Sequence, residues 1–409
     1  MDRFKKSIRV SPLFTALTMD LVLFVPIDTL FFTMVKGLDP SQIMSMIMFS
    51  LIICLLLQKI TFRIISEIGD AKSIRVGAFL LFLSTIILTF GSGYTSMLFY
   101  RTLYEISFVF VNMSKVLLKN NLVVSKRQDE YHEIRNYSNI LYAVIGLVTC
   151  LISGFLFNIN HYWPLYGSIL LSLFAFLISF YFKDSGLTKK SETKKTGNLT
   201  FKKGSLMFMI LLSAGLFFAI AKTGEYDTKL FLQYDLQSFI DDKSLITFYI
   251  TVIVLASRIV RIAGNIILTK LMSKLKHKMS IVLSILTTLS FIIAIIGHLL
   301  PIPNIQRIII MGIGFLLLMG TRDTLQVYIE DTALKNAGRH ESQKVMLDLE
   351  MYRKVCVLIL SAIFAIVLDE YNLLIVEILL VIVSIYGVIH NYHLFKELMK
   401  KKLLKRSER

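Results

Sequence analysis

Charged side chains that interrupt long apolar segments are the residues of this chain best suited to chemistry. Removing a charge from water costs about 3 kcal/mol or more at the centre of an apolar layer, unless the charge faces a partner or an aqueous cavity. Such residues therefore predict a site that binds a substrate, an ion or a proton. The candidates are Asp20, Asp28, Arg101, Glu105, Lys222, Glu225, Asp227, Arg258, Arg261, Arg322 and Asp323, with the neighbouring aromatic residues Tyr104 and Tyr226.

Three of the acids are candidates for carrying a proton. Asp28 lies near the middle of its apolar segment and follows Pro26, a residue that can kink a helix and free a backbone carbonyl. A carboxylate held out of water in this way can gain and lose a proton near neutral pH. Glu105 and Glu225 are further candidates, although Glu105 follows Arg101 by four residues and can form an ion pair with it on one helix face. The alternative is that these acids only neutralise arginines.

Two arginine sites require partners from other segments. Arg258 and Arg261 are three residues apart on one helix face, where like charges repel, and their own segment contains no acid. They therefore need acids from other segments or an anionic substrate. Arg322 and Asp323 are adjacent, so their side chains point about 100° apart on a helix. Each of these two is expected to pair with a different helix.

The composition identifies the apolar segments as membrane-spanning helices. Of the 409 residues, 55% are hydrophobic and 18% are charged, and the mean hydropathy is +0.67. Apolar stretches of about 20 residues recur along the chain, which is the length that crosses a hydrocarbon core as a helix. The segments of a transmembrane barrel would be about 10 residues long and alternating. The sequence therefore predicts an all-α polytopic membrane protein.

Twelve apolar segments are expected, and a polar stretch divides them into two sets of six. Residues 1–182 and 205–409 form the two predicted six-helix bundles, and residues 183–204, which contain seven lysines, form the predicted linker. The expected helices cover roughly residues 12–36, 41–63, 74–91, 96–119, 137–157, 162–182, 205–232, 244–271, 279–300, 306–333, 346–368 and 371–394.

The net charge of +17 is compatible with nucleic-acid binding, but its distribution favours a membrane topology. Lys and Arg concentrate at both termini, in the linker and in alternate connections, which include Lys72, Lys126 and Lys274. The remaining connections carry acids such as Asp235 and Asp242. Because positive residues mark the cytoplasmic side, both termini are expected in the cytoplasm and no nucleic-acid partner is expected. The abundance of Lys, Ile and Leu indicates a bacterial plasma membrane.

Motifs near the second and fourth expected helices resemble those of the major facilitator superfamily. After the second helix, Gly69 and Lys72 match part of that family's loop motif, with Glu67 or a neighbouring serine in place of its acid. The fourth helix begins with an apolar run that ends in Arg101, as in the family, although Glu105 stands where a glycine is usual. With twelve segments and a basic central loop, the chain resembles this family along nearly its whole length, and no subfamily can be assigned.

The resemblance implies two pseudo-symmetric bundles around a cavity that the first, fourth, seventh and tenth helices line. It implies that the third, sixth, ninth and twelfth helices face lipid. The candidate charges lie on the first set and on the eighth helix. Glu377 in the twelfth helix is an exception, and it is expected to reach the membrane interface from a position near the helix end. Tyr100 and Tyr249 lie close to the charges and are further candidates for the cavity.

The leading hypothesis is a secondary active transporter that works by alternating access and is coupled to protons, with export favoured over uptake. The surplus of arginines favours an anionic or zwitterionic substrate, and an amphiphilic substrate stays open. Protons and membrane lipids are the other expected partners, and the chain is expected to act as a monomer. The sequence contains no nucleotide-binding GxxxxGK[ST] motif, so no ATP-driven step and no cofactor are expected.

The alternatives are a flippase for a lipid or a lipid-linked sugar, a membrane-embedded transferase and a membrane sensor. A transferase would need a catalytic constellation of His, Asp or Ser at a membrane face, and none stands out. Cys54, Cys150 and Cys356 lie in or beside apolar segments, without metal-ligand spacing. Neither an enzyme nor a metal site is therefore expected.

Overall fold

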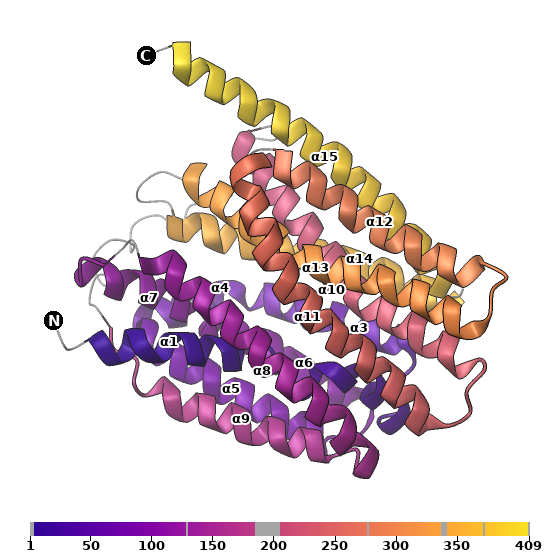
Figure 1. Cartoon of the computed structure of the whole chain (residues 1–409). Helices are drawn as coiled ribbons and strands as arrows, with labels where there is room; N and C mark the ends of the chain where they lie inside the picture. Colours follow the sequence, from indigo (N-terminus) through magenta and orange to yellow (C-terminus); the bar gives the residue numbers. More distant parts are fainter. Residues whose placement is uncertain are drawn as a thin grey trace. The chain divides into compact units, whose positions relative to one another are not determined.

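The computed structural model describes residues 4–127, 130–184, 205–275, 278–336, 342–370 and 373–407. These residues form helices joined by short connections, and no strand occurs among them. The chain divides into two compact units, unit 1 (Met1–Asn198) and unit 2 (Leu199–Arg409), coloured from indigo to magenta and from magenta to yellow in Figure 1. Most of the expected linker, residues 185–204, lies outside the described residues.

Unit 1 contains six helical segments, of which three are interrupted. The elements are α1 (Lys5–Thr18), η2 (Val25–Ile27), α2 (Asp28–Leu30) and η3 (Phe31–Val35) in the first segment, α3 (Pro40–Leu56) and α4 (Gln58–Ile68) in the second, α5 (Asp70–Phe90) in the third, α6 (Gly93–Val111) and α7 (Met113–Val124) in the fourth, α8 (Tyr131–Ile159) in the fifth and α9 (Trp163–Ser179) in the sixth.

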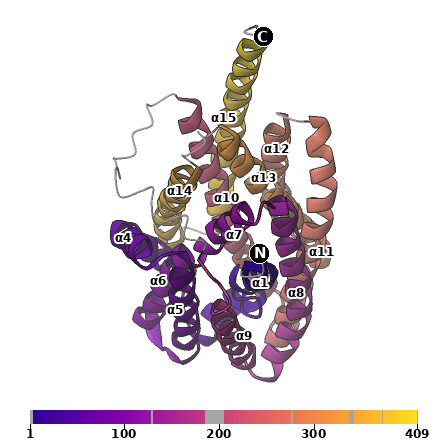
Figure 2. The same cartoon turned by 90° about the vertical axis from the view of Figure 1, so that its left-hand side faces the viewer.

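Unit 2 contains six longer helices, and α10 packs against α13, α14 and α15 within it (Figures 1 and 2). Because α12 packs against both α13 and α15, the unit forms a closed bundle in which α10 has neighbours on several sides. The elements are α10 (Leu206–Gln237), α11 (Lys243–Leu275), α12 (Met279–Leu299), α13 (Asn304–Asn336), α14 (Ser342–Glu370) and α15 (Leu373–Ser407).

Length and composition make these helices membrane spans. Eight of the described helices are long and apolar enough to cross a membrane, and a bent pair, Val25–Val35 with Pro40–Leu56, would make a ninth. The shorter α9 is also apolar, and α6 carries Arg101 and Glu105, which lower its hydropathy. The twelve expected segments are present, six in each unit, so the prediction of an all-α polytopic membrane protein is confirmed.

The first segment, expected as one helix, is broken between α1 and η2. Pro26 has no amide hydrogen, so the carbonyl group of Val22 loses the donor that a continuous helix would supply. The hydroxyl of Thr149 on α8 donates to this carbonyl at 3.1 Å, and the hydroxyl of Ser153 donates to the carbonyl of Leu23 at 2.5 Å. Side chains of α8 therefore satisfy the polar groups that the break exposes, as a segment within a membrane requires.

Helices α11 and α13 cross at a pair of glycines. A Cβ atom on Gly264 of α11 would lie 2.5 Å from the carbonyl oxygen of Gly320 on α13, which is closer than real Cβ contacts. Small residues allow membrane helices to approach in this way, because association in lipid depends on close packing. Arg261 and Asp323 lie three residues from these glycines, so the crossing brings two of the candidate charges together.

Candidate functional site

Helices α10, α11 and α13 of unit 2 bring five candidate residues together. Arg261 donates through Nε and Nη2 to the two carboxylate oxygens of Asp323, at 2.9 Å each. Arg322, the neighbour of Asp323, instead donates through Nη1 to Oε2 of Glu225 on α10. The two adjacent residues thus pair with different helices, as their spacing predicted. These four residues and Arg258 are called the arginine cluster below.

The arginine cluster is partly buried, and more cations than carboxylates act within it. Arg258 and Arg261 are only 3% and 6% exposed, so their charges are largely out of water. The electrostatic field at Glu225 comes from all three arginines and from Lys229, and the field at Asp323 comes from the three arginines. Four cations therefore face two carboxylates among the described residues. Guanidinium groups gathered in this way are well suited to binding the carboxylate or phosphate of an anionic group.

Lys229 belongs with this cluster, although the sequence reasoning passed over it. Its side chain is 2% exposed, and its Nζ lies 5.2 Å from the centre of the Tyr226 ring in a cation–π contact. Lys229 follows Glu225 by one helical turn, and this spacing of four residues is the signal that could have found it. Lys222 lies one turn before Tyr226 and is half-buried.

Asp227 is not part of the arginine cluster. Its position on α10 is two residues after Glu225, which turns its side chain by about 200° on the helix. The described charged group that acts on it is Glu377 of α15. The expectation that Glu377 reaches the membrane interface is wrong, because this side chain is 0% exposed and accepts a hydrogen bond from Thr228 at 2.8 Å. The packing of α15 against α10 buries it.

Unit 1 contains a second polar group, formed by α6 and the residues after α1. Nη2 of Arg101 donates to Oε1 of Glu105 at 2.9 Å, which is the ion pair that their spacing predicted. The guanidinium also lies over the ring of Tyr104, 5.1 Å from its centre. The Tyr104 hydroxyl donates to Oδ1 of Asp20 at 2.5 Å. These four residues are called the α6 cluster below.

Asp28 lies at the start of α2, and its burial is nearly complete. Its Oδ1 accepts a hydrogen bond from the backbone amide of Thr29 at 2.7 Å. A carboxylate at the first turn of a helix is stabilised by the free amide groups there. Asp28, Asp20 and Arg101 all act electrostatically on Tyr100, a fully buried residue of α6. Asp28 is thus near the α6 cluster and also has a local structural role.

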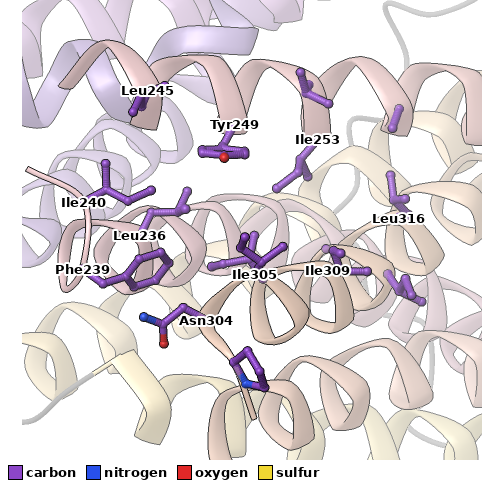
Figure 3. Close-up of a pocket in the computed structure, with 16 residues that line it drawn as sticks. Leu236, Phe239, Ile240, Leu245, Tyr249, Ile253, Asn304, Ile305, Ile309 and Leu316 are labelled. Carbon is purple, nitrogen blue, oxygen red and sulfur yellow. The ribbon is translucent and has the colours of Figure 1, made fainter. Parts of the chain in front are cut away.

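An apolar pocket of about 790 Å³ lies in unit 2 where α10 ends, α11 begins and α13 begins. Figure 3 shows Leu245, Tyr249 and Ile253 of one helix facing Ile305 and Ile309 of another. Tyr249, expected beside the charged residues, lines this apolar pocket instead. The other lining residues are Leu236, Phe239, Ile240, Val252, Ala256, Pro303, Asn304, Ile308, Gly312, Ile313 and Leu316.

No group of three or more His, Cys, Asp or Glu side chains that could hold a metal ion occurs in the described part of the chain. The arginine cluster, the α6 cluster and the apolar pocket offer ion pairs, phenol hydroxyls and hydrocarbon side chains for binding.

Solved structures of transporters share this fold. The nucleoside transporter NupG matches in a mutant form with a TM-score of 0.71 and 10% identity, over 96% of this chain and 99% of that one. A second NupG structure matches with a TM-score of 0.64 and 13% identity, over 97% and 99%. A bacterial homologue of the iron transporter ferroportin, in an inward-facing state, matches with a TM-score of 0.63 and 13% identity, over 96% and 98%.

No family model and no curated protein matches the chain. Identities of 10–13% establish a shared fold alone, and this shared transporter fold agrees with the resemblance that the sequence indicated. The three solved structures are of transporters and not of enzymes. The chain is therefore a multi-pass membrane protein with the architecture of transporters.

Proposed function

We propose that this chain is a secondary active transporter that carries a small molecule across a membrane by alternating access. Two observations support this: a fold shared with transporters along nearly the whole chain, and buried charges in both units. The solved neighbours are named for nucleosides and iron, two cargoes of unlike chemistry, so the cargo of this chain is inferred from its own residues.

The observation that carries the proposal is the gathering of three arginines and Lys229 around Glu225 and Asp323. Arg258, Arg261 and Lys229 are buried, and Arg322 is partly buried, so cationic groups are held together with little access to water. Arginine also binds carboxylate and phosphate groups through paired hydrogen bonds. The proposed substrate is therefore a small anion or a zwitterion with an anionic group.

The remaining parts of the proposal concern energy and topology. Coupling to protons would supply the energy, with export favoured over uptake. The location would be a bacterial plasma membrane with both termini cytoplasmic, and the chain would act as a monomer. Residues 183–204 would tether the bundles 1–182 and 205–409 while they move.

Transport by purified protein in proteoliposomes tests the proposal. A panel of radiolabelled carboxylate- and phosphate-bearing metabolites would be offered with and without a pH gradient. Arg322→Ala should lower transport of the active compound by about tenfold or more, because truncating one partner of a buried charge pair costs about 2–5 kcal/mol. Arg63→Ala is the control, since Arg63 forms an exposed ion pair with Glu67, and such pairs contribute little.

Two results would contradict parts of this proposal. If no anion in the panel is transported, or if Arg322→Ala transports as well as Arg63→Ala, the arginine cluster is not the substrate site. Saturable transport by the wild type that does not depend on the pH gradient would contradict coupling of transport to protons. The same conclusion would follow if such transport persisted in Asp28→Asn, Glu105→Gln and Glu225→Gln.

A flippase for a lipid or a lipid-linked sugar is the second candidate function, and the apolar pocket favours it. The apolar pocket of about 790 Å³, lined mainly by hydrocarbon side chains, suits an acyl or polyprenyl chain. The arginine cluster would suit the phosphate of the lipid headgroup. Proteoliposomes with a fluorescent phospholipid and a membrane-impermeant quencher separate the two functions. Flipping of the lipid, without transport of any water-soluble anion, would favour the flippase.

A further inference from the structure

Two carboxyl groups lie together inside unit 2, away from the arginine cluster. Asp227 of α10 and Glu377 of α15 are 1% and 0% exposed. The charge of Glu377 acts on Asp227, and the hydroxyl of Thr228, the next residue after Asp227, donates to Oε1 of Glu377 at 2.8 Å, which links the two helices. This buried carboxyl pair is internal to unit 2, so it does not depend on how the two units are placed.

Three of the four oxygens of this carboxyl pair have no hydrogen-bond donor in the described part of the chain. Neither oxygen of Asp227 has a partner among the described residues, and Oε2 of Glu377 also has none. Buried carboxylate oxygens in proteins are almost always satisfied by donors or by cations. A proton, a cation or an ordered water would supply the partner that these oxygens require.

Several other charged groups on α10 and α13 have partners of their own. On α13, Arg322 and Asp323 belong to the arginine cluster, and on α10 itself Glu225 pairs with Arg322. At the end of α10, Asp235 binds His298 of α12, at 3.1 Å, and Arg307 of α13. None of these is among the groups that act on Asp227, where Glu377 is the one described.

We propose that Asp227 and Glu377 form a proton-binding site in unit 2, separate from the arginine cluster. Two carboxylates that share an apolar site cannot both stay ionised, so at least one takes up a proton from water. Protonation removes the repulsion between the two charges and turns one unpartnered oxygen into a hydroxyl donor. On release, the same proton returns to water and no other group is consumed.

The carboxyl pair and the arginine cluster share α10, on which Asp227 lies two residues from Glu225. In contrast to Asp227 and Glu377, Glu225 directly faces a guanidinium, so adding a proton there would break an ion pair. A role for the carboxyl pair in proton coupling rests on the proposed transport function. The presence of a proton on the pair does not.

Infrared spectroscopy of the purified full chain in lipid nanodiscs tests the site directly. A protonated carboxyl group has a carbonyl stretching band that an ionised carboxylate lacks, and the band shifts to lower frequency in heavy water when the proton exchanges. The variants are Asp227→Asn and Glu377→Gln, which keep the shape of each side chain and remove the titration. Asp241→Asn is the control, because Asp241 is an exposed acid at the turn after α10.

The wild type should show the band at neutral pH, each of the two variants should reduce it by about half or more, and Asp241→Asn should keep it. Gel filtration and circular dichroism of the helices establish whether the variants fold. If they do not fold, the presence or absence of the band in the wild type is the remaining test of the protonated pair. Absence of the band in the wild type from mildly acidic to mildly alkaline pH would overturn the proposal. So would a band that neither variant changes.

Exchange of choline chloride for sodium chloride at constant pH tests whether the carboxyl pair binds a metal cation in place of a proton. A band that sodium removes would assign the pair to a cation and overturn a site for protons alone. Transport measurements then separate the two proposals. Persistence of the infrared band without any transport would leave the protonation site intact and contradict the transporter, whereas transport that keeps its pH dependence in Asp227→Asn would contradict only the coupling role of the pair.

Discussion

The glycine crossing of α11 and α13 allows a prediction with a calculable size. A methyl group at Gly264 would lie 2.5 Å from the carbonyl oxygen of Gly320 and 3.2 Å from its Cα and carbonyl carbon. Ordinary van der Waals contact begins at 3.4 Å, so the helices must separate by the difference between 2.5 and 3.4 Å, about 0.9 Å, to accept alanine. Backbone atoms form the obstruction, and no rotation of a side chain can relieve it.

Overpacking of this kind costs about 1–3 kcal/mol. The separation also acts on Arg261 and Asp323, whose two hydrogen bonds of 2.9 Å lie one turn from the crossing. Gly264→Ala is therefore expected to lower the temperature of unfolding by several degrees and to weaken transport by loosening the arginine cluster. The fall in stability follows from packing alone, whereas the loss of transport also requires that the cluster bind substrate.

The assay is the fraction of detergent-purified protein that stays monodisperse after heating, measured by gel filtration over a series of temperatures. Gly312→Ala is the matched control on α13, because the nearest atom to its new Cβ would be Cδ1 of Ile253 at 3.8 Å. That variant should be as stable as the wild type or slightly more stable, since alanine favours a helix over glycine. Equal stability of Gly264→Ala and Gly312→Ala would refute the close crossing.

Two further predictions concern hydrogen bonds within each unit. Tyr104→Phe removes the donor that lies 2.5 Å from Asp20, and it should destabilise the protein by up to about 1.5 kcal/mol, because Asp20 is only half-buried; an unfolding temperature equal to that of the wild type would contradict this. Asn391→Leu removes the amide that accepts from Ser213 and donates to Ser284, each at 2.6 Å, and it should cost about 1–2 kcal/mol by the same assay. A gain in stability would show that the leucine packs better than the polar network.

Structural features that are decided within a single helix could be predicted from the sequence. Twelve apolar segments follow from hydrophobic length, and the pair Arg101–Glu105 follows from a spacing of four residues on one helix. The adjacency of Arg322 and Asp323 likewise predicted partners on two different helices. These inferences succeeded because helical geometry alone decides them.

Features that depend on which helices are neighbours could not be predicted. Asp227 and Glu225 are two residues apart, and nothing in the sequence states that α15 covers one of them while α11 and α13 face the other. Glu377 was assigned to the interface from its distance to the end of its segment, whereas packing against α10 decides its burial. Tyr249 was grouped with charges by sequence proximity and lies in an apolar pocket.

Thr149 and Ser153 of α8 stabilise the break in the first segment of unit 1 by hydrogen bonding. Their hydroxyls hold the carbonyl groups of Val22 and Leu23, which a straight helix would use for itself. Straightening the segment would break both bonds, and each polar group left unmatched in apolar surroundings costs about 1–3 kcal/mol. The bend at Pro26 is therefore a rigid joint, and α1 to η3 should travel with α8 as one body during any conformational cycle.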